Sequence, residues 1–279
     1  MTISLFWQRL EDQLQGLIAN FPGIAGVAVK TLDAGLTLAI NADEIFPTAS
    51  TIKIHVLTQL LVRAEAGEID LQERLTIQPE SHVLGSGVLA YLNGPTELTL
   101  LDIAILMIIT SDNTATNLCI DAAGLDATNE LLRGLGLTAT KLQRKMMDHI
   151  AAVREQENVS TPQELVTMFA LLHQGKPSPW VAQQTLEILK KPKHGFIDRA
   201  LPSTITIANK PGWVDGVMCD AALVYLPRRP YLVALMTKHA MCTPREQEQF
   251  LFTLAATIHE HMANLDAGNR YGRLVYPTT

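Results

Sequence analysis

The sequence of 279 residues contains only three cysteines, Cys119, Cys219 and Cys242. An odd number of widely spaced cysteines fits neither a disulfide framework nor a zinc motif, so we expect buried free thiols and no bound metal. Basic residues are also scarce: 22 Lys and Arg against 28 Asp and Glu give a net charge of −6. Because no basic surface is available to bind a phosphate backbone, no nucleic-acid partner is expected.

Long apolar segments are missing as well. No window of the sequence is long and apolar enough to cross a bilayer, so no membrane partner is expected. The N-terminus has no basic start, no unbroken apolar run and no small-residue cleavage site, and its apolar residues have the spacing of an amphipathic helix. The sequence as written therefore predicts a cytoplasmic protein; a signal removed from the chain would make it periplasmic or secreted.

What the sequence does contain is the pattern of a packed globule, with 47% hydrophobic and 18% charged residues. Alternating apolar residues predict strands at 26–30, 37–40, 204–210, 218–225 and 231–237. Helical spacing predicts helices at 50–63 and 244–264, with further helix starts at Thr99 and at the capping box Thr161–Glu164. Strands at both chain ends and helices in the middle indicate an α+β fold.

In this α+β fold, both chain ends build an antiparallel sheet that the terminal helices flank, and an all-helical lobe is inserted between them. We expect one catalytic domain with two lobes, an α/β lobe of about 1–47 plus 195–279 and an all-α lobe of about 48–194. No internal repeat or linker-like change of composition divides the chain further.

The first chemical motif is Ser50-Thr51-Ile52-Lys53, at the start of a predicted helix. A spacing of three places the serine and the lysine on one face of the helix, one turn apart. A lysine whose pKa is lowered by burial or by a second cation can take the serine proton. The motif alone is weak, because an N-cap serine followed by a solvated lysine has the same pattern.

Two further motifs follow in order. Ser111-Asp112-Asn113 stands where one predicted helix turns into the next, and Lys210-Pro211-Gly212 closes a predicted strand. Taken singly, these residues have structural explanations, since Ser111 and Asn113 could cap a helix and Lys210 could be a surface lysine. The three motifs together resemble the S-x-x-K, S-D-N and K-T-G signatures of class A β-lactamases and penicillin-binding proteins, and the resemblance extends over nearly the whole chain.

The resemblance implies a role for each motif residue and a three-layer α/β/α fold. Ser50 would be acylated, Lys53 would activate it, and Ser111 would relay a proton toward the leaving group. Asn113 would hydrogen-bond a substrate amide, and Lys210 would attract a substrate carboxylate. The backbone N–H groups of Ser50 and of Trp213, which follows Gly212, would form the oxyanion hole. No cofactor is implied.

The stretch from Leu142 to Ile150 departs from the family pattern. Class A β-lactamases carry a glutamate there that activates the deacylating water, and counting from Leu142 and Arg144 places that position on Met146. A thioether cannot accept a proton from water. Asp148, or the neighbouring His149, remains open as a replacement base. The arginine–aspartate pair usual in this loop is also altered, because Asn158 stands where the acid is expected.

The strand motif departs as well, because Pro211 replaces the hydroxyl residue of K-T-G. That hydroxyl normally helps to bind the substrate carboxylate, so Lys210 would carry more of this task. Proline is tolerated on an unpaired strand edge, so Pro211 is compatible with the expected fold.

These features predict a class A β-lactamase-like serine hydrolase that forms an acyl-enzyme on Ser50. It would cleave a β-lactam or a similar small amide or ester whose acyl part carries a carboxylate. Two alternatives stay open: a DD-peptidase or penicillin-binding protein with slow deacylation, favoured by Met146, and a non-catalytic receptor for penicillin-type ligands. The Ser50–Lys53 pair argues against the receptor.

Overall fold

The computed structural model describes residues 2–33 and 35–275. Contacts within the chain define two compact units, which are described separately: Met1–Phe46, Thr161–Phe169 and His194–Thr279 form one, and Pro47–Ser160 with Ala170–Lys193 form the other. The sequence placed 161–169 in the helical lobe, whereas the structure groups these residues with the sheet. Among the described helices, none has the length and apolar character needed to span a membrane.

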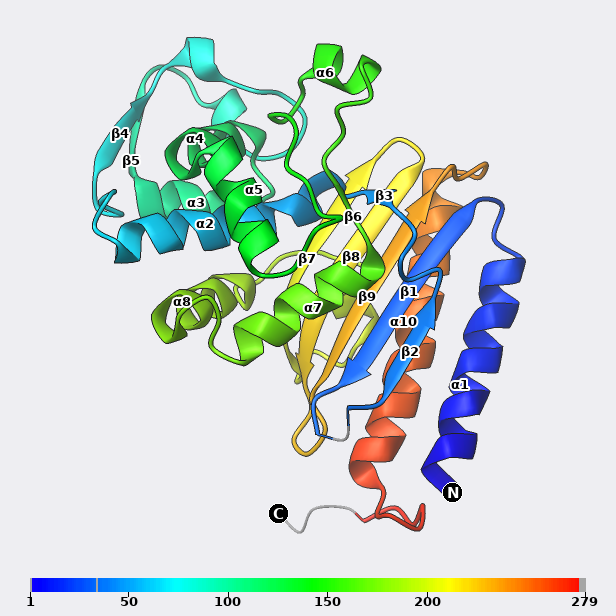
Figure 1. The fold of residues 1–279 in the computed structure, drawn as a ribbon. Coiled ribbons are helices and arrows are strands. Elements are labelled where there is room, and N and C mark those ends of the chain that lie inside the picture. The colour runs from blue at the N-terminus through cyan, green and yellow to red at the C-terminus, as the bar shows by residue number, and fades with distance from the viewer. Residues whose placement is uncertain (1, 34, 276–279) are drawn as a thin grey trace. The chain divides into compact units, whose positions relative to one another are not determined.

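The first unit is built on a five-stranded antiparallel sheet (Figure 1). Its strands are β1 (Ile24–Thr31), β2 (Thr37–Ile40), β7 (Thr206–Val214), β8 (Val217–Tyr225) and β9 (Tyr231–Lys238). Their order is β2-β1-β9-β8-β7, so strand β1 from the N-terminal part pairs along its whole length with β9 from the C-terminal part. The predicted sheet made from both chain ends is confirmed, and β7 lies at its edge.

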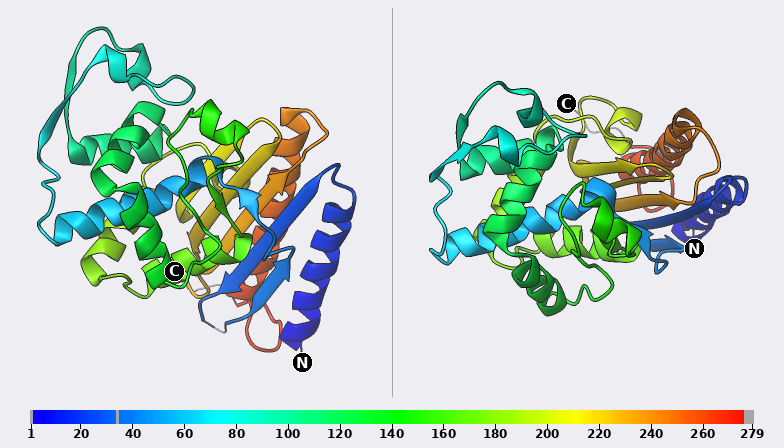
Figure 2. Two further views of the ribbon diagram at one scale, coloured as in Figure 1. Left: turned by 45° about the horizontal axis from the view of Figure 1, so that its top comes forward. Right: turned by 90° about the horizontal axis from the view of Figure 1, so that it is seen from above.

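Helices cover one face of this sheet: α1 (Thr2–Ala19), α9 (Ile197–Ala200) and α10 (Pro244–Ala267). Figures 1 and 2 show α1 and α10 side by side on the same side of the strands. Leu10 and Leu14 of α1 are completely buried in a core shared with β1, β8, β9 and α10. The period of the apolar residues in α1 therefore predicted the buried face correctly.

The opposite face of the sheet contacts the start of α7 (Pro162–His173). A Cβ atom added to Gly26 of β1 would stand 2.7 Å from the Phe46 ring and 2.8 Å from the Pro162 ring, so only glycine permits this close packing. Thr161 caps α7, with its Oγ1 accepting the N–H of Glu164 at 3.0 Å, as the sequence predicted. With α1 and α10 on one face and α7 on the other, the unit has the predicted three layers.

The second unit is mainly helical. Its helices are η1 (Ala49–Ile52), α2 (Lys53–Glu65), η2 (Pro79–Ser81), η3 (Leu89–Tyr91), α3 (Leu100–Ile109), α4 (Asn113–Ala123), α5 (Leu125–Gly134), α6 (His149–Val153) and α8 (Pro179–Leu189). It also contains strands β4 (Arg74–Ile77) and β5 (Thr96–Thr99), which form a two-stranded sheet, and β6 (Val159–Ser160); β3 (Phe46–Pro47) lies at its start. These short strands, with their weak apolar alternation, were not predicted.

Helix α2 is the centre of this unit. Every residue from Lys53 to Leu61 is buried, because α2 packs against α3, α4, α5 and α8. Helix α3 begins where the sequence predicted, with Thr99 Oγ1 accepting the N–H of Asp102 at 3.0 Å. A helix that is buried on all sides is held rigidly, so α2 is a stable support for the residues at its start.

The three cysteines are free thiols. Cys119 on α4 and Cys219 on β8 are buried, as expected, whereas Cys242 is only half-buried. Burial raises the pKa of the Cys119 and Cys219 thiols well above the usual range. Both therefore act as small apolar residues of the core.

A buried carboxyl group joins β7 and β8 to the segment before α9. Asp220 on β8 accepts the backbone N–H groups of Phe196 and Ile197, both at 2.9 Å, and lies 3.3 Å from the Asn209 amide. Burial and, to a smaller extent, the nearby Asp198 raise its pKa to about 7. The three N–H donors oppose this shift only in part.

The free energy of unfolding is therefore expected to fall as the pH rises from about 4 to 7. In this range the folded chain keeps the Asp220 proton that the unfolded chain has lost, so stability decreases with pH. Between pH 5 and pH 8 the loss should be about 2 kcal/mol. Urea unfolding at both pH values measures it. Asp220→Asn should abolish this loss and the exposed Asp215→Asn should retain it; equal slopes in all three proteins would refute the assignment.

Candidate active site

The serine of the first motif stands where the 3₁₀ turn η1 leads into α2. Ser50 is half-buried in η1, and Lys53 begins α2, so the predicted helix start is confirmed. The preceding residue, Ala49, has a positive φ of 45°. Non-glycine residues adopt this conformation rarely and at an energetic cost, and such strained residues concentrate at functional sites.

The ammonium group of Lys53 is the centre of a hydrogen-bond cluster. Its Nζ donates to the Ser111 carbonyl at 2.6 Å, to Ser111 Oγ at 3.1 Å and to Asn113 Oδ1 at 3.2 Å. Lys53 is completely buried. The structure thus brings together three of the residues that the sequence selected, one turn of helix from Ser50. The Ser111 hydroxyl lies within proton-transfer distance of the lysine.

The turn that presents Ser111 is also strained, with a φ of 54° at this residue. Asp112 stabilises the turn by capping α4: its Oδ1 accepts the N–H of Ala115 at 2.9 Å. Its Oδ2 accepts two more N–H groups, those of Val88 at 2.6 Å and Leu89 at 2.8 Å. One buried carboxylate therefore connects the Ser111 turn to the 84–89 loop.

The same loop is bound to Asn113. The Asn113 side chain donates to the Leu84 carbonyl at 3.0 Å, and the Asn113 backbone N–H donates to the Ser86 carbonyl at 3.0 Å. Two glycines in the Gly85-Ser86-Gly87 segment are typical of a flexible loop. The bond from Asn113 to the Ser86 carbonyl, with the bonds of Leu84, Val88 and Leu89 on either side, shows instead that the segment is anchored to the Ser111 turn.

Gly87→Ala is expected to destabilise the protein by about 2–4 kcal/mol, because the new Cβ would overlap the Asp112 carboxylate and Gly87 has a φ of 103°. Gly94→Ala is the matched control, since Gly94 has a φ of 81° and open space around it. It should lose only about 1 kcal/mol. Thermal unfolding of both variants measures the difference; equal losses would show that backbone strain, and not the Asp112 contact, is responsible.

The backbone of Met146, in the loop of residues 142–158, is held by the side chain of Asn117. Asn117 Oδ1 accepts the Met146 N–H at 2.7 Å, and Asn117 Nδ2 donates to the Met146 carbonyl at 3.2 Å. Asn117 lies one helical turn after Asn113 on α4, so both carboxamides share a face of that helix. Counting along the sequence selected Met146 but missed Asn117, whose spacing of four from Asn113 was the available signal.

The ends of the loop are joined differently from the family pattern. Arg144 pairs with Glu157, Nη2 to Oε2 at 2.8 Å, so the acid stands one residue before the position that the sequence analysis considered. Asn158 binds backbone instead: its Oδ1 accepts the N–H of Gln143 at 2.7 Å, and its Nδ2 donates to the Arg144 carbonyl at 3.0 Å. The loop therefore keeps an arginine–acid pair, although Asn158 does not supply the acid.

The two groups considered as replacement bases lie beside Met146. Asp148 caps α6, with its Oδ1 accepting the N–H of Ala151 at 2.9 Å, and His149 is the first residue of that helix. Both belong to the lining of a cavity of about 570 Å³. This cavity is bounded by His82, Val83, Leu84, Asn117, Lys145, Met146, Met147, Asp148 and His149.

His55 on α2 does not act as a general base in this arrangement. It is completely buried, and burial lowers its pKa to about 4. In the described part of the chain, neither of its ring nitrogens has a hydrogen-bond partner. The ring is therefore a neutral part of the helix packing.

The remaining predicted residues belong to strand β7 of the sheet unit. The Lys210 ammonium donates to the Pro211 carbonyl at 2.8 Å. Gly212 pairs with Cys219 of β8, and Trp213, with 54% of its surface exposed, pairs with Met218. Pro211 stands on an edge strand, where a missing N–H is tolerated. The roles of these residues toward a substrate stay predictions.

No group of three or more His, Cys, Asp or Glu side chains within residues 2–33 and 35–275 is arranged to hold a metal ion. The chemistry that the described residues offer is that of a serine hydroxyl, a buried lysine amine and a second hydroxyl, that of Ser111, beside the lysine. This set can form and break an acyl ester through proton transfers among side chains.

Comparison with known proteins gives a consistent assignment. The sequence model named "Beta-lactamase enzyme family" matches residues 9–262. The β-lactamase CARB-3 of Pseudomonas aeruginosa is 25% identical over 261 residues, which cover 91% of this chain and 90% of that enzyme.

Solved structures show the same similarity. The β-lactamase of Sphaerobacter thermophilus superposes with a TM-score of 0.85 and 31% identity, covering 92% of this chain and 98% of that one. The protein PBP-A superposes with a TM-score of 0.81 and 30% identity, covering 90% and 95% of the two chains. The family match over most of the chain, the Ser50–Lys53 and Ser111–Asn113 motifs and the shared fold all agree. The chain therefore belongs to the β-lactamase enzyme family, as a serine hydrolase of the class A, penicillin-recognising type.

Proposed function

We propose that this protein is acylated on Ser50 by a β-lactam, or by a related small amide or ester, and that it releases the acyl group slowly. The observation that carries the proposal is the cluster at Lys53, whose ammonium binds Ser111 Oγ and Asn113 Oδ1 three residues after Ser50. The arrangement supplies a nucleophile, a base and a proton relay without a cofactor.

In the acylation step Lys53 acts in its neutral form: the amine, having lost one ammonium proton, takes the Ser50 proton while Ser50 Oγ attacks the substrate carbonyl carbon. The C–N or C–O bond of the substrate then breaks, and the Ser111 hydroxyl passes a proton to the leaving nitrogen or oxygen. Ser111 can recover this proton from Lys53 Nζ, which lies 3.1 Å from its Oγ. The cycle of protons is closed by side chains alone.

Substrate binding is proposed for Asn113 and for residues of strand β7. The Asn113 amide would bind the substrate amide, and the Lys210 ammonium would bind the substrate carboxylate. Because Pro211 lacks a hydroxyl, the carboxylate would depend on Lys210 more strongly than in the family pattern. The N–H groups of Ser50 and Trp213 would stabilise the oxyanion, with Gly212 allowing the substrate to approach the strand.

The deacylation step is the slow one, because a thioether occupies the position of the base. Met146 cannot accept a proton from water, and its backbone is held in the loop by two hydrogen bonds with Asn117, one accepted and one donated by the Asn117 side chain. The carboxylate of Asp148, the alternative base, already accepts the N–H that caps α6. An acyl-enzyme without a positioned base should persist.

A penicillin-binding protein of the DD-peptidase type is the second candidate, and Met146 is the observation that favours it. Among the similar structures is a leucine-to-glutamate variant of PBP-A, described as an acyl-enzyme complex with penicillin G. A DD-peptidase would share the acylation step on Ser50 and differ in its substrate, which would be a cell-wall peptide in place of a β-lactam.

The experiment that tests the proposal is an intact-mass time course of the protein with excess penicillin, recording protein and drug together. A penicilloyl adduct that outlasts the removal of free drug is expected. Rapid loss of drug without an adduct would show efficient turnover and so contradict slow deacylation. If neither an adduct nor a loss of drug is observed, the substrate is instead an ester or a peptide.

A further inference from the structure

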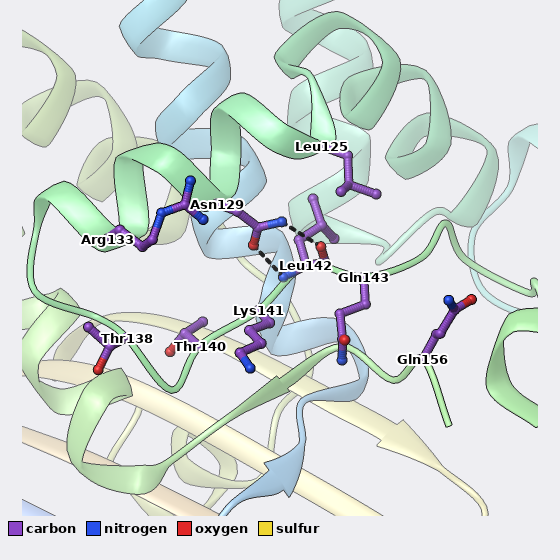
Figure 3. A pocket seen from close by; sticks show the side chains of 9 residues that line it. All are labelled: Leu125, Asn129, Arg133, Thr138, Thr140, Lys141, Leu142, Gln143 and Gln156. Atoms are coloured by element: carbon purple, nitrogen blue, oxygen red, sulfur yellow. Dashed lines mark hydrogen bonds between the residues drawn. The ribbon is translucent and has the colours of Figure 1, made fainter. Parts of the chain in front are cut away.

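Two features of the described chain lie outside the proposed catalytic cluster: a cavity beside helix α5 and an exposed aromatic ring on strand β7. The cavity has a volume of about 330 Å³ (Figure 3). Figure 3 shows the side chains of Arg133 and Lys141 pointing away from each other. The Asn129 carboxamide already binds the Leu142 backbone, accepting its N–H at 2.9 Å and donating to its carbonyl at 2.8 Å. The polar groups of this cavity therefore do not converge on one ligand, whereas the ring on β7 offers a continuous apolar face.

The exposed ring is that of Trp213, near the end of β7. Trp213 has 54% of its surface exposed, and the residues of the described chain give its indole neither a hydrogen bond nor a ring contact. Trp7 differs, because it is buried and donates its indole N–H to the Thr37 carbonyl at 2.8 Å. An indole contributes strongly to binding when a ligand buries it, since its area is large. The Trp213 ring is therefore available to a ligand.

The position of Trp213 on the strand determines which side chains share its face. Side chains alternate along a strand, so Asn209, Pro211 and Trp213 belong to one face of β7. Their exposure increases toward the turn into β8: Asn209 is buried, Pro211 is half-buried and Trp213 is exposed. The segment before α9 covers the Asn209 end, because a Cβ atom added to Gly195 would stand 2.7 Å from the Asn209 amide nitrogen. The end with Pro211 and Trp213 is the open one.

Strand pairing holds the indole in place. Trp213 is directly opposite Met218 of β8, which is buried. Directly opposite residues have Cβ atoms about 4.5–5.5 Å apart, so the Met218 side chain stands beside the base of the indole. Because β8 also pairs with β9 on its other side, the backbone that carries Trp213 is part of the sheet. A ring fixed in this way loses little conformational entropy when a ligand binds to it.

We propose that the indole of Trp213 stacks on an aromatic ring of the substrate, in the part of the molecule that carries the carboxylate. This inference rests on the proposed function, in which the Trp213 N–H stabilises the oxyanion of the same reaction. The place of the ring follows from Pro211, which stands where the family pattern has a hydroxyl that binds the carboxylate. Pro211 and Trp213 are two residues apart on one face, a distance of about 7 Å. Two rings in this place favour a flat apolar substituent, because aromatic rings stack on an indole in an offset geometry.

The test compares two cephalosporins that share their acyl side chain and carry either a phenyl or a methyl group next to the carboxylate. Intact mass measures the rate at which each compound acylates the full chain, and the ratio of the two rates measures the preference for phenyl. Trp213→Leu should lower this ratio by about 3- to 10-fold, and Trp213→Phe, which keeps a ring, should retain most of it. An effect on the oxyanion cancels in the ratio, because both compounds use the same backbone N–H. Trp180→Leu is the matched control, since Trp180 is 39% exposed on α8, and it should leave the ratio unchanged.

A second measurement does not require acylation. In the Ser50→Ala protein, the phenyl compound at saturation should protect the exposed indole from fluorescence quenching by acrylamide. The protection should disappear when Trp213→Leu is added and remain when Trp180→Leu is added. An unchanged ratio in the Trp213→Leu protein, or no protection by the phenyl compound, would overturn the inference. The absence of an adduct with both compounds would instead overturn acylation on Ser50, and the quenching measurement would still decide whether Trp213 binds the ring.

Discussion

Replacing Met146 by glutamate is expected to shorten the lifetime of the penicilloyl-enzyme by a factor of about 10²–10⁴, the usual contribution of a positioned general base. Asn117 holds the backbone of residue 146 at both its N–H and its carbonyl. The new carboxylate would therefore start from a defined backbone position and could activate the deacylating water. Acylation, which uses Ser50 and Lys53, should change little.

The measurement is the decay of the adduct mass after free penicillin has been removed. Met146→Gln is the matched control, because glutamine has the length of glutamate and can hydrogen-bond water without serving as its base. A lifetime in the glutamate variant equal to that of the unmodified protein would mean that residue 146 is not at the base position. A faster decay in both variants would point to water access instead of base catalysis.

Replacing Ser50 by alanine is expected to abolish the adduct and all turnover of penicillin. This change removes only the hydroxyl group of Ser50. The cluster of Lys53 with Ser111 and Asn113 should remain, because its hydrogen bonds do not involve the Ser50 side chain. Intact mass with excess drug measures the adduct, and drug consumption measures turnover. Reversible penicillin binding should persist in this variant.

Ser86→Ala is the control for this change, because Ser86 is exposed and contributes its backbone carbonyl to the Asn113 N–H. It should be acylated like the unmodified protein. An adduct on the Ser50→Ala protein would identify another nucleophile. If drug consumption also persisted unchanged, Ser50 would have no part in the reaction.

The main elements and the motif residues could be predicted from the sequence. Local periodicity determined the strands 26–30 and 218–225, which the structure extends to β1 and β8, because alternation of apolar residues reports one buried face. The cap residues Thr99 and Thr161 located the starts of α3 and α7, because each binds a backbone N–H only three residues later in the chain. The spacing of three between Ser50 and Lys53 placed both at a helix start, as observed.

The sequence by itself therefore determined the fold class, the family resemblance and the choice of Ser50, Lys53 and Ser111. Only the tertiary structure decided which groups hold the 142–158 loop, including the pairing of Arg144 with Glu157 and the two hydrogen bonds between Asn117 and Met146. The physical reason is that periodicity and capping depend on neighbours along the chain. Hydrogen bonds between a loop and a distant helix depend on where folding brings each donor and acceptor.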